Sequence, residues 1–210
     1  MALLAAGLVA VTALVAGLGF LVTEVLRDSW VGEFDRAAVE ALTTLGVPAL
    51  DGPAAVVNAL GGTRFVVAVA LSAAVLAVAG TRRWRPALFL LTALLGDVVV
   101  YVLVSRVLID RARPEAGAEG QALPDLASFP SGHAAAAMTL YGAIALIVHA
   151  HVSGRWRTVA LVVPVVLGVL VAVARLYRGV HWPTDVLASA LLSLTWLAIT
   201  YALLIRRRRS

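Results

Sequence analysis

Three short groups of polar residues interrupt an apolar chain, and their side chains suit the binding and transfer of an anion. They read "RVLIDRARP" from residue 106, "PSGH" from residue 130 and "ARLYRGVHWPTD" from residue 174. Arginine is the side chain best shaped to hold phosphate at two points, and histidine can act as nucleophile or as acid and base. The candidate residues are Arg106, Arg113, Ser131, Gly132, His133, Arg175, His181 and Asp185.

The group "PSGH" stands at the start of an apolar run and allows two interpretations. Proline and serine both favour the first turn of a helix, so the group could simply begin one. Alternatively, the backbone N–H groups after Ser131 would face a bound anion, assisted by the helix dipole. On this second interpretation Gly132 would let the backbone come close to the anion.

His181 and Asp185 are one helical turn apart and follow the sequence of a helix start, with Pro183 between them. A carboxylate at one imidazole nitrogen fixes the tautomer and makes the other nitrogen a better base or nucleophile. The alternative is a histidine hydrogen-bonded at a helix cap, and for this pair taken alone we favour that alternative.

The composition is that of an integral membrane protein. Of the 210 residues, 61% are hydrophobic and 14% are charged, and the mean hydropathy is +0.96. Cysteine is absent, which excludes disulfides, thiolate nucleophiles and cysteine-ligated metals. All 17 basic residues are arginine. We predict one all-α domain, residues 1–210, with six transmembrane helices. The predicted helices cover residues 2–22, 61–80, 87–105, 133–150, 158–174 and 185–205.

The arginines predict the orientation in the membrane. Segments 81–85, 151–157 and 206–210 carry nine arginines and no acid. The positive-inside rule therefore places them, and both termini, in the cytoplasm, with the last segment as an anchor at anionic lipid. This bias accounts for the net charge of +5, so no nucleic-acid partner is needed.

The segments left on the outer face are 23–60, 106–132 and 175–184, and all eight candidate residues then lie near helix ends at this one surface. The positive-inside rule disfavours the arginines of the first group at the outer surface unless they have a function at that surface. Either they hold an anion, or nearby acids neutralise them. These acids are Asp110, Glu115 and Glu119.

The first outer segment also contains a predicted amphipathic helix. Its apolar stripe consists of Phe34, Ala38, Leu42 and Leu45, and Pro48 follows its end. It is either an interfacial helix or an ordinary connecting helix, and the sequence favours neither.

In order and spacing, the three groups resemble the motifs of the membrane-bound type 2 phosphatidic acid phosphatases, also called lipid phosphate phosphatases. That family carries K-x6-R-P, P-S-G-H and S-R-x5-H-x3-D. The chain has R-VLIDRA-RP at 106–114, PSGH at 130–133 and AR-LYRGV-H-WPT-D at 174–185. The combination between apolar spans is highly specific, and the six-helix plan extends the resemblance over nearly the whole chain.

The chain departs from the family motifs at two positions. Arg106 stands where the family usually has lysine, which keeps the charge but not the shape of the side chain. Ala174 replaces the usual serine and removes a hydroxyl. Neither change affects the two histidines or the aspartate.

The resemblance implies a role for each matching residue. His181 would attack phosphorus and become a phosphohistidine, Asp185 would orient it, and His133 would protonate the leaving oxygen and then activate water. The phosphate would be held by Arg106, Arg113, Arg175, Ser131 and Gly132. Arg111 matches a bacterial form of the first motif and is a candidate substrate contact. No metal and no cofactor are expected, since the arginines would stabilise the charge.

The implied function is hydrolysis of a membrane lipid phosphate at the outer surface of the plasma membrane. Candidate substrates are an isoprenyl diphosphate such as undecaprenyl diphosphate, phosphatidic acid and phosphatidylglycerol phosphate. Two alternatives stay open: a phosphotransferase that uses the same histidine, and a non-catalytic lipid carrier. Asp97, an acid inside the third span, is expected to contact a neighbouring helix, with substrate binding as the lesser alternative.

Overall fold

The computed structural model describes residues 1–115 and 127–206, which form helices and no strand. Six helices in this part of the chain are long and apolar enough to cross a membrane. They are α1 (Ala2–Phe20) with its π-helical end η1 (Leu21–Val25), α4 (Thr63–Thr81), α5 (Arg85–Leu103) with η2 (Val104–Leu108), α7 (Gly132–His149), α8 (Arg155–Tyr177) and α9 (Pro183–Leu204). The prediction of an all-α, multi-pass membrane protein is confirmed.

The six predicted spans are found with shifted ends. Two of the largest shifts occur where arginine lies near a helix terminus: α8 begins at Arg155, and η2 continues α5 as far as Leu108. A hydropathy pattern ends at the first charge, whereas a helix can continue because a long arginine side chain reaches the interface. Arg106 therefore lies on a helical turn of η2, and Arg175 lies in the last turn of α8.

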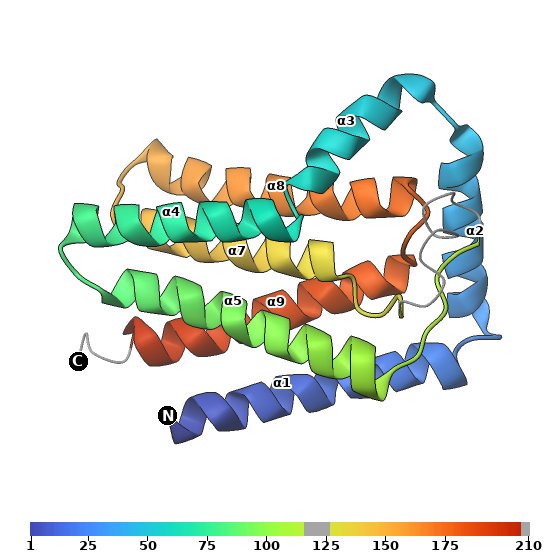
Figure 1. Ribbon diagram of the computed structural model, residues 1–210, viewed down its shortest axis with the longest axis horizontal. Helices are drawn as coiled ribbons and strands as arrows, with labels where there is room; N and C mark the ends of the chain where they lie inside the picture. The colour runs from blue at the N-terminus through green and yellow to red at the C-terminus, as the bar shows by residue number, and fades with distance from the viewer. Residues whose placement is uncertain (116–126, 207–210) are drawn as a thin grey trace.

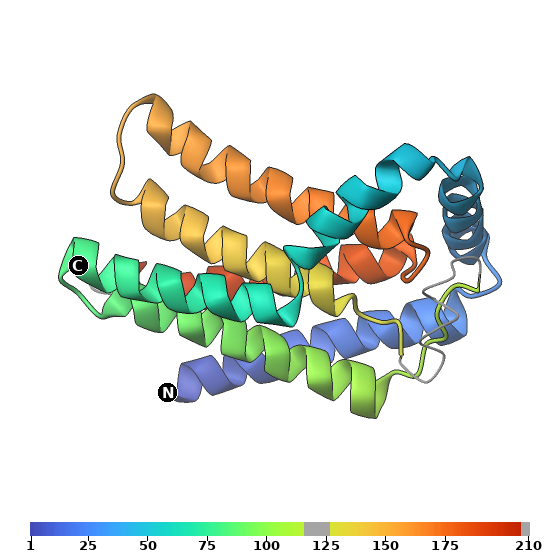
Figure 2. The ribbon, with the colours of Figure 1, turned by 45° about the horizontal axis from the view of Figure 1, so that its top comes forward.

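The helix α7 runs through the middle of the bundle and packs against α5, α8 and α9 (Figures 1 and 2). Small side chains let neighbouring helices approach it closely. The buried alanines of α7 are Ala134, Ala135, Ala137, Ala143 and Ala145.

Buried polar contacts also join the spanning helices, and two of them involve α5. The indole of Trp196 on α9 is buried and donates to the carbonyl of Ala93 on α5 at 2.9 Å. The buried Asp97 accepts a hydrogen bond of 2.9 Å from Thr139 on α7. The expected contact of Asp97 with a neighbouring helix is therefore present.

The segment between α1 and α4 forms two helices, α2 (Trp30–Leu45) and α3 (Pro48–Ala59). Only the first was predicted. Pro48 was interpreted as the residue after a helix, but it also begins the next one, where its missing N–H costs nothing. Figures 1 and 2 show α2 crossing one end of the bundle at a steep angle to the spanning helices.

The packed face of α2 differs from the stripe expected from its sequence. Its buried residues are Gly32, Asp35 and Val39, whereas Phe34 and Leu45 are 54% and 65% exposed. The helix is fixed by a polar face that contains a buried carboxylate, and part of its apolar stripe lies on the surface.

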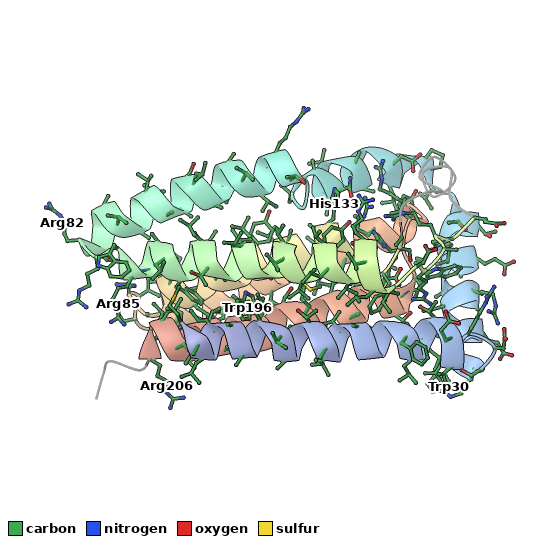
Figure 3. The ribbon with its side chains drawn as sticks, turned by 60° about the horizontal axis from the view of Figure 1, so that its bottom comes forward. Trp30, Arg82, Arg85, His133, Trp196 and Arg206 are labelled. Carbon is green, nitrogen blue, oxygen red and sulfur yellow. The ribbon has the colours of Figure 1, made fainter. Side chains whose placement is uncertain are left out.

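The two ends of the bundle differ in character. Figure 3 shows Arg82, Arg85 and Arg206 at one end, and His133 and Trp30 toward the other. Glu119, one of the acids that could neutralise the arginines of the first group, lies outside the described residues, as do residues 207–210 of the expected anchor 206–210.

Candidate active site

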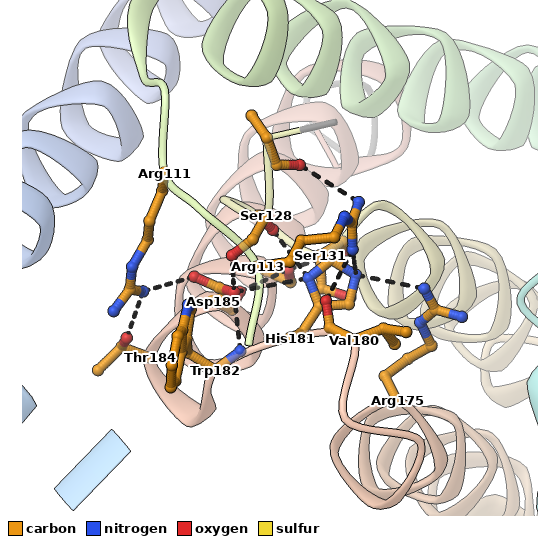
Figure 4. A network of polar contacts seen from close by, with 12 residues as sticks. Arg111, Arg113, Ser128, Ser131, Arg175, Val180, His181, Trp182, Thr184 and Asp185 are labelled. Carbon is orange, nitrogen blue, oxygen red and sulfur yellow. Dashed lines mark hydrogen bonds and ion pairs between the residues drawn. The ribbon is translucent and has the colours of Figure 1, made fainter. Parts of the chain in front are cut away.

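Most of the predicted site residues meet at the end of the bundle that α2 crosses. The start of α7, the end of α8 and the start of α9 converge there with two chain segments, 109–113 and 127–131 (Figure 4). The two segments are joined by a hydrogen bond of 2.8 Å from the Ser128 N–H to the Arg111 carbonyl. Residues far apart in the sequence therefore form one polar network.

His181 lies at the centre of this network and is only 2% exposed. Its Nδ1 is 2.8 Å from the backbone carbonyl of Ser128. A carbonyl oxygen can only accept, so Nδ1 carries the proton and Nε2 keeps its lone pair as an acceptor for the nearby arginines. The Nε2 atom faces two guanidinium groups, with Arg113 at 3.3 Å and Arg175 at 3.4 Å.

The surroundings of His181 keep its ring neutral. Burial lowers its pKa to about 4, and the nearby charges of Arg175 and Arg113 act in the same direction. The carboxylate of Asp185 opposes them, but more weakly than burial. At neutral pH, His181 is therefore a neutral imidazole with an available lone pair, the form that a nucleophile needs.

Asp185 is fully buried and binds the backbone around His181. Its Oδ2 accepts hydrogen bonds from the Ser128 hydroxyl at 2.5 Å and from the Trp182 N–H at 2.9 Å. The distance from Oδ2 to the His181 Nδ1 is 3.5 Å, longer than the contact of Nδ1 with the Ser128 carbonyl. Asp185 thus orients His181 partly through Ser128, which the sequence did not predict.

Arg113 and Arg175 are each fixed by a further hydrogen bond besides the contact with His181. Arg113 donates to the carbonyl of Val180 at 2.7 Å, and Arg175 donates to the side chain of Asn58 on α3 at 2.7 Å. The Nε of Arg175 is buried and has no hydrogen-bond partner within the described residues. An unsatisfied buried donor beside a lone pair indicates a place for an anionic ligand.

Ser131 supplies a second unsatisfied group. It precedes the first residue of α7, and its hydroxyl is buried with no partner among residues 1–115 and 127–206. The helix N-terminus adds free backbone N–H groups at the same place. Together, the hydroxyl, the helix terminus and the arginines have the features expected of a phosphate pocket.

Gly132 has a packing role that the sequence did not indicate. A Cβ atom at this position would lie 2.9 Å from two ring carbons of Tyr101 on α5. Because these distances are shorter than a normal contact, any side chain here would displace either Tyr101 or the start of α7.

The two remaining predicted residues lie at the edge of the network. His133, in the first turn of α7, is half-buried, within electrostatic range of His181, Arg175 and Arg113. Arg106 is exposed on η2 and acts electrostatically on Arg113. Neither side chain is fully buried, so both could contact a ligand at the edge of the network.

Arg111 has partners other than those expected of a substrate contact. It is buried behind Asp185 and donates to the Asp185 carboxylate at 2.5 Å, to the Thr184 hydroxyl at 2.7 Å and to Asp35 of α2 at 2.7 Å. None of the motifs marks Asp35. Asp35 could have been recognised from its spacing, because it shares one helix face with Gly32 and Val39.

No three imidazole or carboxylate side chains in the described part of the chain are placed to share a metal ion. The groups that could hold a ligand here are cationic or neutral donors, which fit an oxyanion.

Comparison with known proteins agrees with this geometry. The family model of the PAP2 superfamily matches residues 61–209, a stretch that contains all three motif groups. The chain therefore belongs to the PAP2 superfamily.

Particular relatives match smaller parts of the chain. An undecaprenyl-diphosphatase of Sulfolobus acidocaldarius is 34% identical over 110 residues, which are 52% of this chain and 48% of that protein. Phosphatidylglycerophosphatase B of Bacillus subtilis is 39% identical over 69 residues, 32% of this chain and 34% of that protein. The matched parts thus span about half of the first relative and a third of the second.

The fold is shared with a solved structure over almost its full length. The crystal structure of a transmembrane PAP2-type phosphatidylglycerolphosphate phosphatase from Bacillus subtilis superposes with a TM-score of 0.82 at 22% identity. The superposition covers 96% of this chain and 98% of that one.

Proposed function

We propose that this protein is a metal-independent lipid phosphatase that works through a phosphohistidine at His181. The observation that carries the proposal is the tautomer of His181: Nδ1 donates to a backbone carbonyl, so the lone pair of Nε2 points at the place where two arginines would hold a phosphate. Membership of the PAP2 superfamily supports the same chemistry.

In the first step, the Nε2 lone pair of His181 attacks phosphorus and the bond from phosphorus to the leaving oxygen breaks. Once the negative charge of the bound phosphate offsets the nearby arginines, His133 takes up a proton and donates it to that oxygen, so the lipid leaves as an alcohol, or as a monophosphate when the substrate is a diphosphate. The charge that develops on the non-bridging oxygens is stabilised by Arg106, Arg113 and Arg175.

In the second step, water attacks the phosphohistidine. His133, now neutral, takes a proton from the water, and the P–N bond breaks to regenerate the His181 lone pair. Inorganic phosphate is released, and His133 is again protonated for the next cycle. The unpaired hydroxyl of Ser131 and the N–H of Gly132 would hold the phosphoryl group through both steps.

The substrate we propose is a lipid whose phosphate lies at the membrane surface. The site is at the end of a bundle of six apolar helices, within reach of a headgroup whose tails remain in the bilayer. The names of the relatives support undecaprenyl diphosphate and phosphatidylglycerol phosphate as candidates, and phosphatidic acid shares their phosphate chemistry. The arginine-rich loops at the opposite end support an outward-facing site in the plasma membrane.

The test is phosphate release by the purified protein in detergent with EDTA. Undecaprenyl diphosphate, phosphatidic acid and phosphatidylglycerol phosphate are compared side by side, with wild type against His181→Ala. Release in EDTA that disappears in the variant is expected. An absolute need for divalent metal would contradict the arginine-based mechanism. Phosphate that appears only on an added lipid alcohol would contradict hydrolysis and indicate transfer.

A further inference from the structure

A carboxylate on the outer helix α2 is part of the network behind the catalytic pair. Asp35 is 1% exposed, and its Oδ2 accepts hydrogen bonds from Arg111 at 2.7 Å and from the Thr184 hydroxyl at 2.5 Å. Its Oδ1 accepts from the Thr184 N–H at 3.1 Å. That N–H belongs to the first turn of α9, whose dipole favours a negative charge. Asp35 therefore fastens α2 to the start of α9.

Arg111 lies between two carboxylates, Asp35 on one side and Asp185 on the other. Both ion pairs are buried, so the guanidinium has little freedom while both partners are present. If Asp35 lost its charge, Arg111 would keep a single anionic partner and could rotate about it. A buried charge that loses a partner is strongly disfavoured, and the surrounding structure shifts in response.

We propose that Asp35 is a positioning residue for the phosphoryl-transfer site. It fixes Arg111 and the first turn of α9, and these hold Asp185 and the Ser128 carbonyl in line with the His181 ring. This inference rests on the proposed function, since the role assigned to Asp35 is to orient the His181 ring so that Nε2 points at phosphorus. The residue contacts neither the phosphate pocket nor His181 directly.

The test compares Asp35→Asn with wild type in the phosphate-release assay. The variant keeps the size of the side chain and removes its charge. We expect kcat to fall by about 100-fold, the effect of a small misplacement of reacting groups, with KM little changed because Arg113 and Arg175 are held by other partners. Glu33→Gln, on the exposed side of the same helix, is the matched control and should keep full activity.

The same substitution in an Asp185→Asn variant distinguishes a positioning role of Asp35 from a general loss of folding. Asp35 is proposed to act by positioning Asp185. In Asp185→Asn that carboxylate has already lost its charge, so adding Asp35→Asn should lower kcat no further. The NMR resonance of the His181 Nδ1 proton should move in Asp35→Asn and stay in place in Glu33→Gln. An unchanged kcat in Asp35→Asn, or an equal loss in both backgrounds, would overturn the inference. Inactive wild-type protein would instead overturn the proposed function.

A second inference concerns the opposite end of the bundle, where two hollows adjoin. One is an apolar cavity of about 370 Å³ between α4 and α7, lined in part by Ala77 and Ile144. The other, of about 150 Å³, is lined in part by Arg83 and Arg85. The two share Thr81, Ile147 and His151, so they lie next to each other.

The layout of this surface matches an anionic phospholipid. An apolar groove along two spanning helices suits an acyl chain, and the arginines at the groove mouth suit a phosphate headgroup. Segment 81–86, where α4 is joined to α5, contains three arginines and no acid. Basic pockets between spanning helices at the cytoplasmic face are typical sites for anionic lipid headgroups. Charge complementarity therefore identifies the occupant as an anionic lipid of the leaflet opposite the active site.

We infer that Arg83 and Arg85, together with the α4–α7 groove, bind one anionic diacyl phospholipid as a site separate from the substrate site. The test is thermal unfolding of the delipidated protein in micelles that contain phosphatidylglycerol or phosphatidylcholine. Saturating vanadate, a phosphate mimic, occupies the active site throughout. Phosphatidylglycerol should raise the unfolding temperature more than phosphatidylcholine does, and soluble glycerol phosphate should have no effect because it lacks the tails.

Two variants test the two halves of this lipid site. Arg83→Gln with Arg85→Gln should abolish the preference for phosphatidylglycerol, and Ala77→Trp should weaken binding by filling the groove. Arg155→Gln with Arg157→Gln removes the same charge from the same end outside the hollows and should keep the preference. Equal shifts with both lipids, or equal losses in both double variants, would overturn this inference.

Discussion

At the scale of single residues, the chemistry depends on which nitrogen of His181 is free. The Ser128 carbonyl at 2.8 Å accepts a hydrogen bond from Nδ1, and burial keeps the ring neutral, so Nε2 is in the unprotonated form that the proposed nucleophile requires. Asp185 contributes by organising the backbone as well as by its charge, since its nearest hydrogen bonds go to Ser128 and Trp182.

The first prediction concerns the protonation of His181. Its pKa of about 4 lies below the ordinary value of about 6.5, so the ring stays neutral down to about pH 5. An NMR titration of ring-labelled histidines in micelles should place the His181 midpoint near 4, assigned by its absence in His181→Ala. Because the unfolded chain takes up this proton at higher pH, His181 costs stability progressively as pH falls from about 6.5 to about 4. A midpoint at or above 6.5 would contradict the buried neutral ring.

The second prediction concerns Gly132. Gly132→Ala should sharply lower kcat, because the added methyl group meets the Tyr101 ring and moves the start of α7. Adding Tyr101→Ala should restore part of the activity by removing the obstacle. Gly17→Ala on α1, where a Cβ meets nothing within 4 Å, is the control and should leave the rate unchanged. Full activity in Gly132→Ala would show that the close approach is unimportant.

The sequence identified the residues at the pocket better than those behind it. The motif residues have fixed spacing and helix-end chemistry, so His181, Asp185 and Ser131 could be located from pattern alone. Asp35 and Asn58 act through contacts with residues 149 and 117 positions away, and no local pattern records such contacts.

At the scale of elements, the helices α2 and α3 between the first two spans each reach the site through one polar side chain. The α2 helix provides Asp35, and α3 provides Asn58, which holds Arg175. The six spans were predictable because hydropathy alone determines them. The α3 helix was not, since a proline that ends one helix can begin another.

The third prediction tests the contribution of α3. Asn58→Ala should lower kcat/KM about tenfold or more, because a hydrogen bond to a charged group contributes roughly 1.5–3 kcal/mol and 1.4 kcal/mol is a factor of ten. Tyr177→Phe also removes contacts of α8 with Val47 and with Asp51 on α3, but away from His181, and should have little effect on the rate. Equal effects of the two substitutions would indicate that α3 acts only by general packing.

At the scale of the whole molecule, the two ends of the bundle carry different kinds of residues. Arg82, Arg85 and Arg206 lie at one end, and the polar network lies at the other (Figures 3 and 4). The arrangement was predictable from the arginine pattern because charge bias and helix number together fix which loops share a face. The tilt of α2 and the depth of the site depend on packing, which the pattern does not encode.

The fourth prediction concerns orientation. The chain has no cysteine, so single cysteines can be placed without background. In intact cells, Glu33→Cys should react with a membrane-impermeant maleimide, whereas Arg82→Cys should react only after the membrane is opened. Both positions are exposed and outside the polar network. The reverse pattern would place the site in the cytoplasm.

The central claim is that Nε2 of His181 forms a covalent bond to phosphorus, and trapping that intermediate tests it most directly. Protein mixed with lipid phosphate would be quenched rapidly in alkali, where phosphohistidine survives, and the modified residue located by mass spectrometry and 31P NMR. His133→Ala should accumulate the intermediate if the water step slows more than the first step. The account predicts phosphate on His181 at Nε2, and none in His181→Ala. Phosphate on another residue, on Nδ1, or on no residue while turnover continues would contradict it.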